Sequence, residues 1–426
     1  MTRTEAGRSN VNGEIPDLAD PRTFAEHDLG DFWRRLRAEE PLHWQPPRGD
    51  RSGFWVLSRH ADIMAVYRDD EQFSSERGNV LVTLLAGGDS AAGRMLAVTD
   101  GPRHQKLRKV LLKAFSPRAL SRISERVRDN TRRLVSAAVE GGECDFAAEI
   151  ASRIPMATIS DLLGVPESDR DFLLQQTKSA LSSDDADGTD LDSVLARNEI
   201  LLYFGEQCEQ RRRNPGDDVI SVLATSSIDG EPLSEDDVVL NCYSLIIGGD
   251  ETSRLTMIDA VRTFADREDQ WRRVKDHQVD LDPVVDEVLR WASPTMHFGR
   301  RAVRDVELHG RTIRAGDVVT LWHSSANRDE RVFAEPEVFD VARSPNKHLA
   351  FGYGPHYCLG AYLAKVEVAE VLSALRDFAT GFELAGPVQR IHSNFLTGIS
   401  SLPVRFAPDA AGLERHRAAR SAGVDG

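Results

Sequence analysis

Cysteine is scarce in this sequence, with four residues among 426. No two of them share a CxxC spacing; they are Cys144, Cys208, Cys242 and Cys358. Disulfide-stabilised secreted proteins and zinc knuckles need closely spaced cysteines, so the pattern argues against both classes. It favours a reducing compartment.

Long apolar runs are also missing. No stretch approaches the ~18 apolar residues that a membrane span needs. The first fifteen residues are polar and lack the apolar segment of a secretory signal peptide. The net charge of −15 argues against nucleic acid as a general partner. We therefore expect a cytoplasmic protein whose partners include neither nucleic acid nor a membrane.

The chain is long enough, at 41% hydrophobic residues, to bury a large core. We see no repeat and no long linker, and predict one domain over 21–408 between flexible tails at 1–20 and 409–426. Apolar spacing predicts helices over 59–67, 121–215, 234–261, 282–292 and 361–378, and strands over 53–57, 306–308 and 318–321. The fold class is therefore mainly α with minor β.

Local signals mark where some of these elements begin and end. Ser234 followed by Asp237 resembles a capping box at the start of the long helix over 234–261. Gly381 is a plausible stop for the helix over 361–378. The stretch Ser182–Asp192, which carries five aspartates, is expected to form a mobile acidic loop.

Residues 351–360 form a glycine-rich loop around one cysteine. They read Phe-Gly-Tyr-Gly-Pro-His-Tyr-Cys-Leu-Gly, and an apolar helical pattern follows. Cys358 thus lies just before a helix N-terminus, where the helix dipole favours a thiolate. A thiolate among glycines is a soft metal ligand, although a lone cysteine is more often inert packing.

A second unusual stretch, Gly248-Gly249-Asp250-Glu251-Thr252, interrupts the long apolar helix. Two adjacent glycines inside a helix cost roughly 1 kcal/mol each relative to alanine. The hydroxyl of Thr252 can reach the carbonyl of Gly248, which bends a helix. An acid beside an alcohol suits proton delivery, whereas the glycines alone could simply allow tight helix crossing. The pattern does not explain Arg254.

Together these segments resemble the cytochromes P450. The loop matches the cysteine motif FGxGxHxCxG, and residues 248–252 match the oxygen-binding motif (A/G)Gx(D/E)T. Further matches are an ExxR at 287–290, a PxxFDxxR at 336–343 and an HxxxR at 104–108. The matches run from about residue 50 to 405. The resemblance implies the P450 fold, in which a long central helix lies over a haem beside small β-sheets, and haem-thiolate monooxygenase activity.

The resemblance also assigns roles to individual residues. Cys358 would be the axial ligand of haem b, bordered by Gly248, Gly249, Phe351, Gly352, Gly354 and Gly360. His104, Arg108, Arg300 and His356 would contact the haem propionates. Glu251 and Thr252 would deliver protons to bound oxygen. Glu287, Arg290 and Arg343 would form a buried triad that supports the cysteine loop. Taken singly, most of these residues would be read as solvated surface groups or surface ion pairs.

The substrate pocket is predicted by location only. Residues 78–98 are a partly apolar, glycine-bearing stretch typical of a lid, and the pocket candidates are Leu84, Leu85, Met296, His297, Phe298, Phe395 and Leu396. Core packing is the alternative for each. The sequence leaves open a terpenoid, a macrolide, an aromatic compound or a carrier-protein-bound amino acid, and also hydroxylation, epoxidation or coupling. A role in secondary metabolism is expected by analogy.

Electrons should come from separate proteins, because only 66 residues follow Gly360, too few for a flavin domain. The resemblance is to bacterial P450s that a ferredoxin and its reductase supply. Seven basic residues and no acid occur within 101–124. We predict that the basic patch at 103–122 docks the ferredoxin; a solvated helix face is the alternative.

Two other functions compete with an O₂-dependent monooxygenase. A peroxide-using haem-thiolate protein would retain full activity without Thr252, although family members of this kind usually lack the acid–alcohol pair. A non-enzymatic haem carrier or sensor would have no substrate-sized pocket and no substrate-induced spectral shift.

Overall fold

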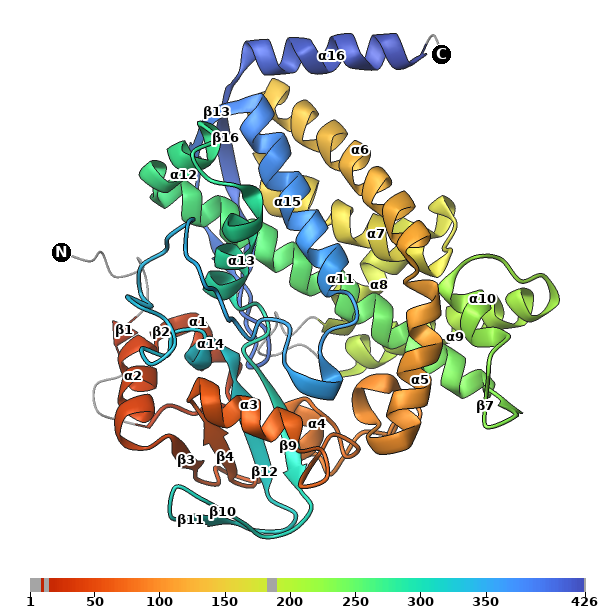
Figure 1. The fold of residues 1–426 in the computed structure, drawn as a ribbon, viewed down its shortest axis with the longest axis vertical. Coiled ribbons are helices and arrows are strands. Elements are labelled where there is room, and N and C mark those ends of the chain that lie inside the picture. Colours follow the sequence, from red (N-terminus) through yellow and green to blue (C-terminus); the bar gives the residue numbers. More distant parts are fainter. Residues whose placement is uncertain (1–8, 11–14, 182–189, 425–426) are drawn as a thin grey trace.

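The protein is described here from a computed structural model that covers residues 9–10, 15–181 and 190–424 (Figure 1). Residues 182–189 of the expected acidic loop lie outside these ranges, and Asp190 already begins a helix. Helices dominate and form most of the molecule on one side, while a small sheet region occupies the other (Figure 1). The predicted class, mainly α with minor β, is confirmed.

The α-helices of the described residues are α1 (Pro21–Glu26), α2 (Gly30–Glu39), α3 (His60–Arg68), α4 (Leu81–Leu85), α5 (Gly101–Ala114), α6 (Pro117–Gly141), α7 (Arg153–Leu163), α8 (Arg170–Leu181), α9 (Asp190–Arg213), α10 (Val219–Ala224), α11 (Glu235–Asp266), α12 (Glu268–Lys275), α13 (Leu281–Ala292), α14 (His323–Ala326), α15 (Ala361–Phe378) and α16 (Ala410–Val424). Short 3₁₀ turns occur at η1 (Leu96–Val98), η3 (Glu167–Asp169) and η4 (Gly354–His356), and a π turn at η2 (Ala147–Ala151).

The strands are β1 (Ser9–Asn10), β2 (His27–Asp28), β3 (Leu42–Gln45), β4 (Phe54–Leu57), β5 (Phe73–Ser74), β6 (Glu143–Asp145), β7 (Ser227–Ile228), β8 (Glu231–Pro232), β9 (His297–Ala302), β10 (Val306–Leu308), β11 (Arg311–Ile313), β12 (Val318–Trp322), β13 (Ala379–Leu384), β14 (Gln389–Arg390), β15 (Ile399–Ser401) and β16 (Pro403–Pro408). The largest sheet has the order β3-β4-β12-β9-β5, and only its β4–β12 pair is parallel. A second sheet has the order β13-β16-β6.

Helix α11 runs through the middle of the helical part (Figure 1). Its start is the predicted capping box: the amide of Asp237 donates to the Ser234 hydroxyl, and the Ser234 amide donates to the Asp237 carboxylate. Three acidic residues in the first turn complement the helix dipole. The helix packs against α7, α9, α13 and α15. Its central course brings residues 248–252 next to the cysteine loop.

The two glycines of α11 have different roles. A Cβ on Gly249 would lie 3.0 Å from the side chain of Ile159, so this glycine allows close approach of α7. A Cβ on Gly248 would meet no atom within 4 Å. Tight helix crossing, one of the readings from sequence, therefore holds for Gly249 but not for Gly248. The helix continues through both, and the Thr252 hydroxyl donates to the Gly248 carbonyl at 3.2 Å.

Helix α15 follows the cysteine loop and has the predicted bounds. Gly381 does not act as the stop signal that the sequence suggests. The helix ends at Phe378, and Gly381 lies within strand β13, opposite Ala407 of β16. The strand that pairs with β16 begins at Ala379, directly after the last helical residue and two residues before Gly381. Tertiary strand pairing therefore replaces the local stop signal.

The chain ends also differ from the expected tails. Residues 410–424 form helix α16, in which Leu413 is buried and His416 stacks on Phe378 at 4.9 Å. Near the other end, Leu18 is fully buried. The ordered packing therefore extends on both sides beyond the limits 21–408, while the assignment of a single domain stays a prediction.

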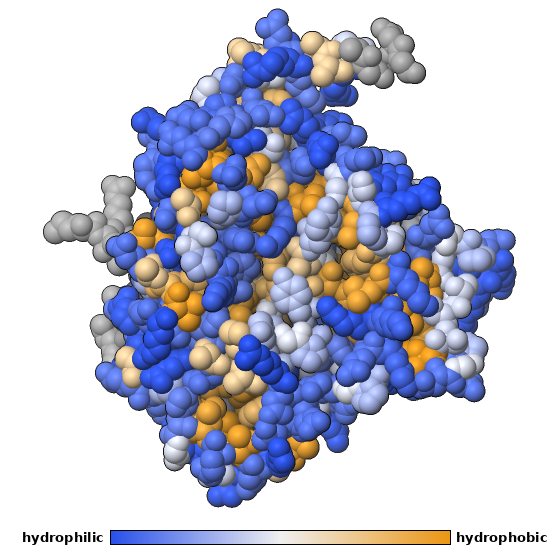
Figure 2. Space-filling model, in the orientation of Figure 1, coloured by the Kyte–Doolittle hydropathy of each residue, from blue (hydrophilic) through white to orange (hydrophobic). Residues whose placement is uncertain are grey.

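Hydrophilic side chains cover most of the face shown in Figure 2, with small apolar patches between them. Among the described residues, no helix is both long enough and apolar enough to cross a membrane.

Candidate active site

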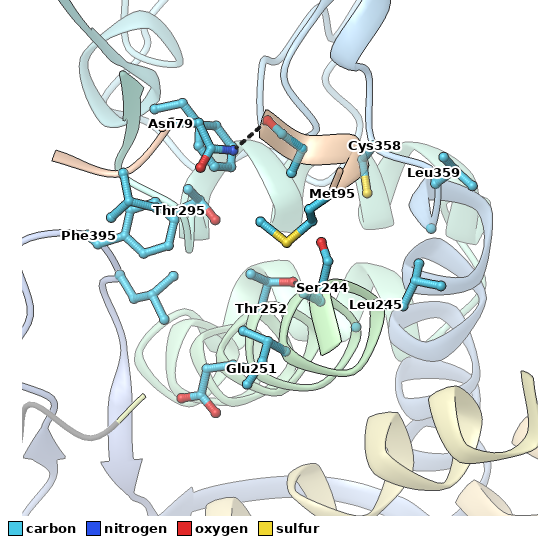
Figure 3. A pocket seen from close by; sticks show the side chains of 18 of the residues that line it. Asn79, Met95, Ser244, Leu245, Glu251, Thr252, Thr295, Cys358, Leu359 and Phe395 are labelled. Atoms are coloured by element: carbon cyan, nitrogen blue, oxygen red, sulfur yellow. Dashed lines mark hydrogen bonds between the residues drawn. The ribbon is translucent and has the colours of Figure 1, made fainter. Parts of the chain in front are cut away.

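A cavity of 1390 Å³ lies between α11, the cysteine loop and strand β9. Cys358 points its sulfur into the cavity from one side, and Ser244, Leu245 and Thr252 of α11 lie on another (Figure 3). The cavity lining includes most of the predicted cofactor residues: His104, Arg108, Gly248, Gly249, Arg300, Phe351, Gly352, His356, Cys358 and Gly360. Segments far apart in the sequence thus surround one space.

The loop around Cys358 depends on glycine. Gly352 and Gly354 have φ angles of 68° and 70°, which other residues rarely adopt. A Cβ on Gly354 would also lie 2.5 Å from the carbonyl oxygen of Tyr67 in α3. The Cys358 amide donates to the Phe351 carbonyl at 3.0 Å and closes the loop. The backbone is therefore fixed so that the thiol faces the cavity.

The environment of the thiol favours a bound cation. Burial raises the pKa of Cys358, while hydrogen bonds from the Gly360 and Ala361 amides and the charge of Arg108 lower it. A thiolate here still needs additional positive charge, which a metal ion beside the sulfur would supply. The other three cysteines, Cys144, Cys208 and Cys242, are buried away from the cavity lining.

Three nitrogen donors at the cavity lack an acidic partner. Within the described residues, Arg108 and Arg300 form no ion pair; Arg108 donates to the Tyr357 carbonyl at 2.8 Å and Arg300 to the Gly299 carbonyl at 2.7 Å. The Nε2 atom of His104 is buried without a partner. Buried cations are costly unless an anion accompanies them. The site therefore fits a ligand that carries carboxylates.

His356, the fourth predicted propionate residue, already has a partner. Its Nε2 atom lies 2.8 Å from Asp100, which also accepts hydrogen bonds from Ser74 and the Ser75 amide. Burial opposes ionisation of Asp100, but these hydrogen bonds lower its pKa to about 2. The His104 ring lies 4.3 Å from that of His356. Sequence reasoning missed Asp100, although an acid at the start of the HxxxR helix was a usable signal.

The acid–alcohol pair is present on α11, and its acid is engaged. Arg254 donates to Glu251 through Nε at 2.9 Å and also through Nη2. Both side chains are at least nine-tenths buried. Glu251 therefore points away from Cys358, while Thr252 faces the cavity centre (Figure 3). The pairing explains Arg254, and its i,i+3 spacing to Glu251 was a signal that sequence reasoning passed over.

The predicted triad meets around one carboxylate. Glu287 accepts two bonds from Arg290 at 2.7 Å each and one from Arg343 at 3.0 Å, and both Glu287 and Arg290 are fully buried. Asn346 and the Asp340 amide also donate to Glu287. The link to the cysteine loop runs through Asn327, which directly follows α14.

That link consists of two hydrogen bonds on one residue. Arg290 donates to the Asn327 carbonyl at 2.9 Å, and the Asn327 side chain accepts from the Leu349 amide at 2.7 Å. Leu349 lies two residues before Phe351, where the loop begins. The cluster can therefore hold the start of the cysteine loop without touching the cavity.

The predicted substrate pocket is partly wrong. Phe298, Phe395 and Leu396 line the cavity, but Leu84, Leu85, Met296 and His297 do not. The side chains of β9 alternate, so Phe298 and Arg300 face the cavity while His297 and Gly299 face the opposite side of the sheet. On that side His297 packs on Trp322 at 4.3 Å, and Leu84 lies against Gly299.

The segment 78–98 does border the cavity, through residues other than those predicted. Asn79, Val80, Val82, Thr83 and Met95 line it, and Met95 projects into the space below Cys358 (Figure 3). Ser244 and Thr295 also line it and were not predicted. Because residues 81–85 form the short helix α4, Leu84 faces the core while Val82 and Thr83 face the cavity.

Comparison with known proteins agrees with this geometry. A model of the cytochrome P450 family matches residues 258–400. Cytochrome P450 NovI of Streptomyces niveus is 49% identical over 390 residues, which covers 92% of this chain and 96% of the relative. This chain belongs to the cytochrome P450 family.

Other comparisons extend the P450 assignment over the whole described core. Linalool 8-monooxygenase of Pseudomonas putida is 34% identical, and the match covers 93% of this chain and all of the relative. Among solved structures, P450 OxyD, which is involved in the biosynthesis of vancomycin-type antibiotics, has a TM-score of 0.84 at 35% identity over 92% of this chain and all of OxyD. The chain is thus an oxygen-incorporating oxidoreductase with the P450 fold and haem b as its cofactor.

The cavity fits haem b on three observations. Gly248 lines the same cavity as Cys358, and a Cβ there would meet no atom within 4 Å. The thiol lies where a metal cation would stabilise its thiolate. The two arginines and His104 lack acidic partners at the same cavity, as two propionates require.

Proposed function

We propose that this P450 inserts one oxygen atom from O₂ into a C–H or C=C bond of a small organic substrate. The observation that carries the proposal is the placement of Cys358 and the Glu251–Thr252 pair at one cavity. Haem, when bound, supplies the iron chemistry that activates O₂. The roles below concern the chain's own residues.

Cofactor binding would use both ends of the cavity. Cys358 would be the axial ligand, held by the glycine loop. Arg108, Arg300 and His104 would receive the carboxylates, and His356 would remain held by Asp100. The Glu287–Arg290–Arg343 cluster would keep the loop at its position. Gly248, where a Cβ would meet no atom within 4 Å, would leave α11 without a side chain beside the cofactor.

Proton delivery would pass through α11. The Thr252 hydroxyl faces the cavity and would hold a proton donor on the side of the cavity that the cofactor faces. Glu251 is ion-paired with Arg254, so it would exchange protons by rotating away from that arginine. While Glu251 stays paired with Arg254, it would carry no proton from solvent to the cavity.

The electron donor would be a separate ferredoxin with its reductase. Lys106, Lys109 and Lys113 are exposed on α5, and Arg108 of the same helix bonds to the cysteine loop at Tyr357. Lys106 forms a salt bridge with Asp229, so Lys109 and Lys113 are the better candidates for docking. A basic surface this close to the loop would steer an acidic partner.

The substrate would lie between α11, β9 and the segment at 78–98. Phe298 and Phe395 form an edge-to-face pair at 5.6 Å on one wall, and the hydroxyls of Ser244 and Thr295 add polar contacts. We infer a role in secondary-metabolite biosynthesis, which the similarity to OxyD supports. A carrier-bound substrate is one of the forms to be tested.

The decisive experiment is the ferrous–CO spectrum of haem-loaded protein, followed by a substrate panel. We expect the red-shifted Soret band of thiolate ligation, and its absence would overturn the proposal. Terpenoids, macrolides, aromatic compounds and carrier-bound amino acids would then be screened for substrate-induced spectral shifts. A protein that responds to none and consumes no O₂ with its reductase would favour a haem carrier.

A further inference from the structure

A buried phenol–imidazole pair lies beside the proposed propionate site. Tyr67 of α3 and His323 of α14 are joined by a hydrogen bond of 2.6 Å between Oη and Nε2. Tyr67 is 3% exposed and His323 is not exposed. Neither residue belongs to the motifs that carry the P450 resemblance. The pair therefore needs a role of its own.

Both members of the pair are uncharged. Burial lowers the pKa of His323 to about 3 and raises that of Tyr67 well above its usual range. A neutral imidazole and a phenol can share one hydrogen bond between Oη and Nε2, and this bond engages the hydroxyl of Tyr67. Tyr67 also lines the cavity.

That ring lies under a buried cation. The guanidinium carbon of Arg300 is 5.1 Å from the centre of the Tyr67 ring, and Arg300 is 4% exposed. Its one hydrogen bond within the described residues is to the Gly299 carbonyl, so most of its N–H groups stay available. A cation over an aromatic face is held without using those donors.

Tyr67 also contacts the cysteine loop. A Cβ on Gly352 would lie 3.8 Å from Cζ and Oη of Tyr67, and Gly354 packs on the Tyr67 backbone. The same side chain therefore touches the loop of the axial ligand and the arginine of the carboxylate site. Any rotation of the Tyr67 ring would change the position of Arg300 relative to Cys358.

We propose that the Tyr67–His323 pair positions Arg300 for one haem carboxylate and so determines how tightly haem is retained. The proposal rests on the proposed role of Arg300. Tyr67 acts as a positioning residue: His323 fixes the rotation of its ring, and the ring fixes the guanidinium. The carboxylate meets donors that are already oriented, which lowers the entropy lost on binding.

The experiment measures haem release from the ferric protein to excess apomyoglobin. Tyr67→Phe keeps the ring and removes the bond to His323, whereas Tyr67→Leu removes the ring as well. We expect haem release roughly fivefold faster for Tyr67→Phe and at least roughly tenfold faster for Tyr67→Leu. Tyr203→Phe is the matched control, because Tyr203 lies on α9 and its hydroxyl bonds to Asp169 of η3, and neither residue lines the cavity. Haem release from this variant should equal that from the unchanged protein.

A double-variant cycle separates positioning from packing. In an Arg300→Leu protein, Tyr67→Phe should no longer accelerate haem release, because the residue it positions is gone. An equal acceleration in both backgrounds, or release within twofold of the unchanged protein for both Tyr67 variants, would overturn the proposal. Tyr67→Phe preserves side-chain volume, so the cycle stays informative if Tyr67→Leu fails to load haem. A missing thiolate band in the unchanged protein would instead overturn the proposed function.

Discussion

Removing Arg254 should leave the buried carboxylate of Glu251 without its ion-pair partner, and the structure indicates how much stability this costs. Arg254 meets Glu251 through two hydrogen bonds, and the two side chains are 10% and 8% exposed. Charges about 4 Å apart at an effective dielectric constant of about 20 interact by ~4 kcal/mol. We therefore expect Arg254→Met to lower the free energy of unfolding by ~3–5 kcal/mol, the range for breaking a buried pair.

The assay is denaturant unfolding of the haem-loaded protein, followed by tryptophan fluorescence. Arg262→Met is the control, because Arg262 is also largely buried on α11 but pairs with Asp259 and Asp266, away from the cavity lining. The double variant Glu251→Gln/Arg254→Met should be more stable than Arg254→Met alone, because it removes the carboxylate of Glu251 together with its partner. A single variant as stable as the unchanged protein, or a double variant less stable than the single one, would refute the reasoning.

Three further outcomes can be checked. In Thr252→Ala, product formed per O₂ consumed should fall at least roughly tenfold; full coupling would favour the peroxide-using alternative. Lys109→Glu/Lys113→Glu should slow ferredoxin-driven reduction roughly tenfold at low salt and leave peroxide-driven turnover unchanged, whereas Arg415→Glu on α16 should change neither. Burial raises the pKa of Glu367 to about 7, so the folded protein keeps a proton that the unfolded chain loses above pH ~4.5. The free energy of unfolding, measured relative to that of Glu367→Gln, should therefore fall by about 3 kcal/mol between pH 4.5 and 7 and stay level above pH 7. A difference between the two proteins that does not change with pH would contradict the burial of a protonated carboxyl.

Several parts of the site were predictable because their chemistry is local. The glycines around Cys358 are needed for backbone angles that lie within a few residues of it. The capping box at Ser234 joins positions three residues apart, and so does the pair of Glu287 with Arg290. Such short spacings are set by helix and turn geometry, so the sequence pattern alone indicates them.

Other parts depend on which face of an element meets which neighbour. His297 and Phe298 are adjacent and both aromatic, yet only Phe298 reaches the cavity. Their assignment follows from the register of β9 against β12, which no local pattern specifies. Gly381 is a similar case: the helix ends at the predicted Phe378, but Gly381 pairs with Ala407 of β16 and does not cap the helix.

The sequence by itself indicated the family and predicted roles for Cys358, for the Glu251–Thr252 pair and for the Glu287 cluster, because each motif rests on fixed spacings within one or two segments. Only the tertiary structure decided what those groups contact. It paired Glu287 with Asn346, His356 with Asp100, and Tyr67 with His323 beneath Arg300. The last two pairs join residues 256 positions apart, and burial of a charge or a donor gives such pairs their energetic weight only once the chain has folded.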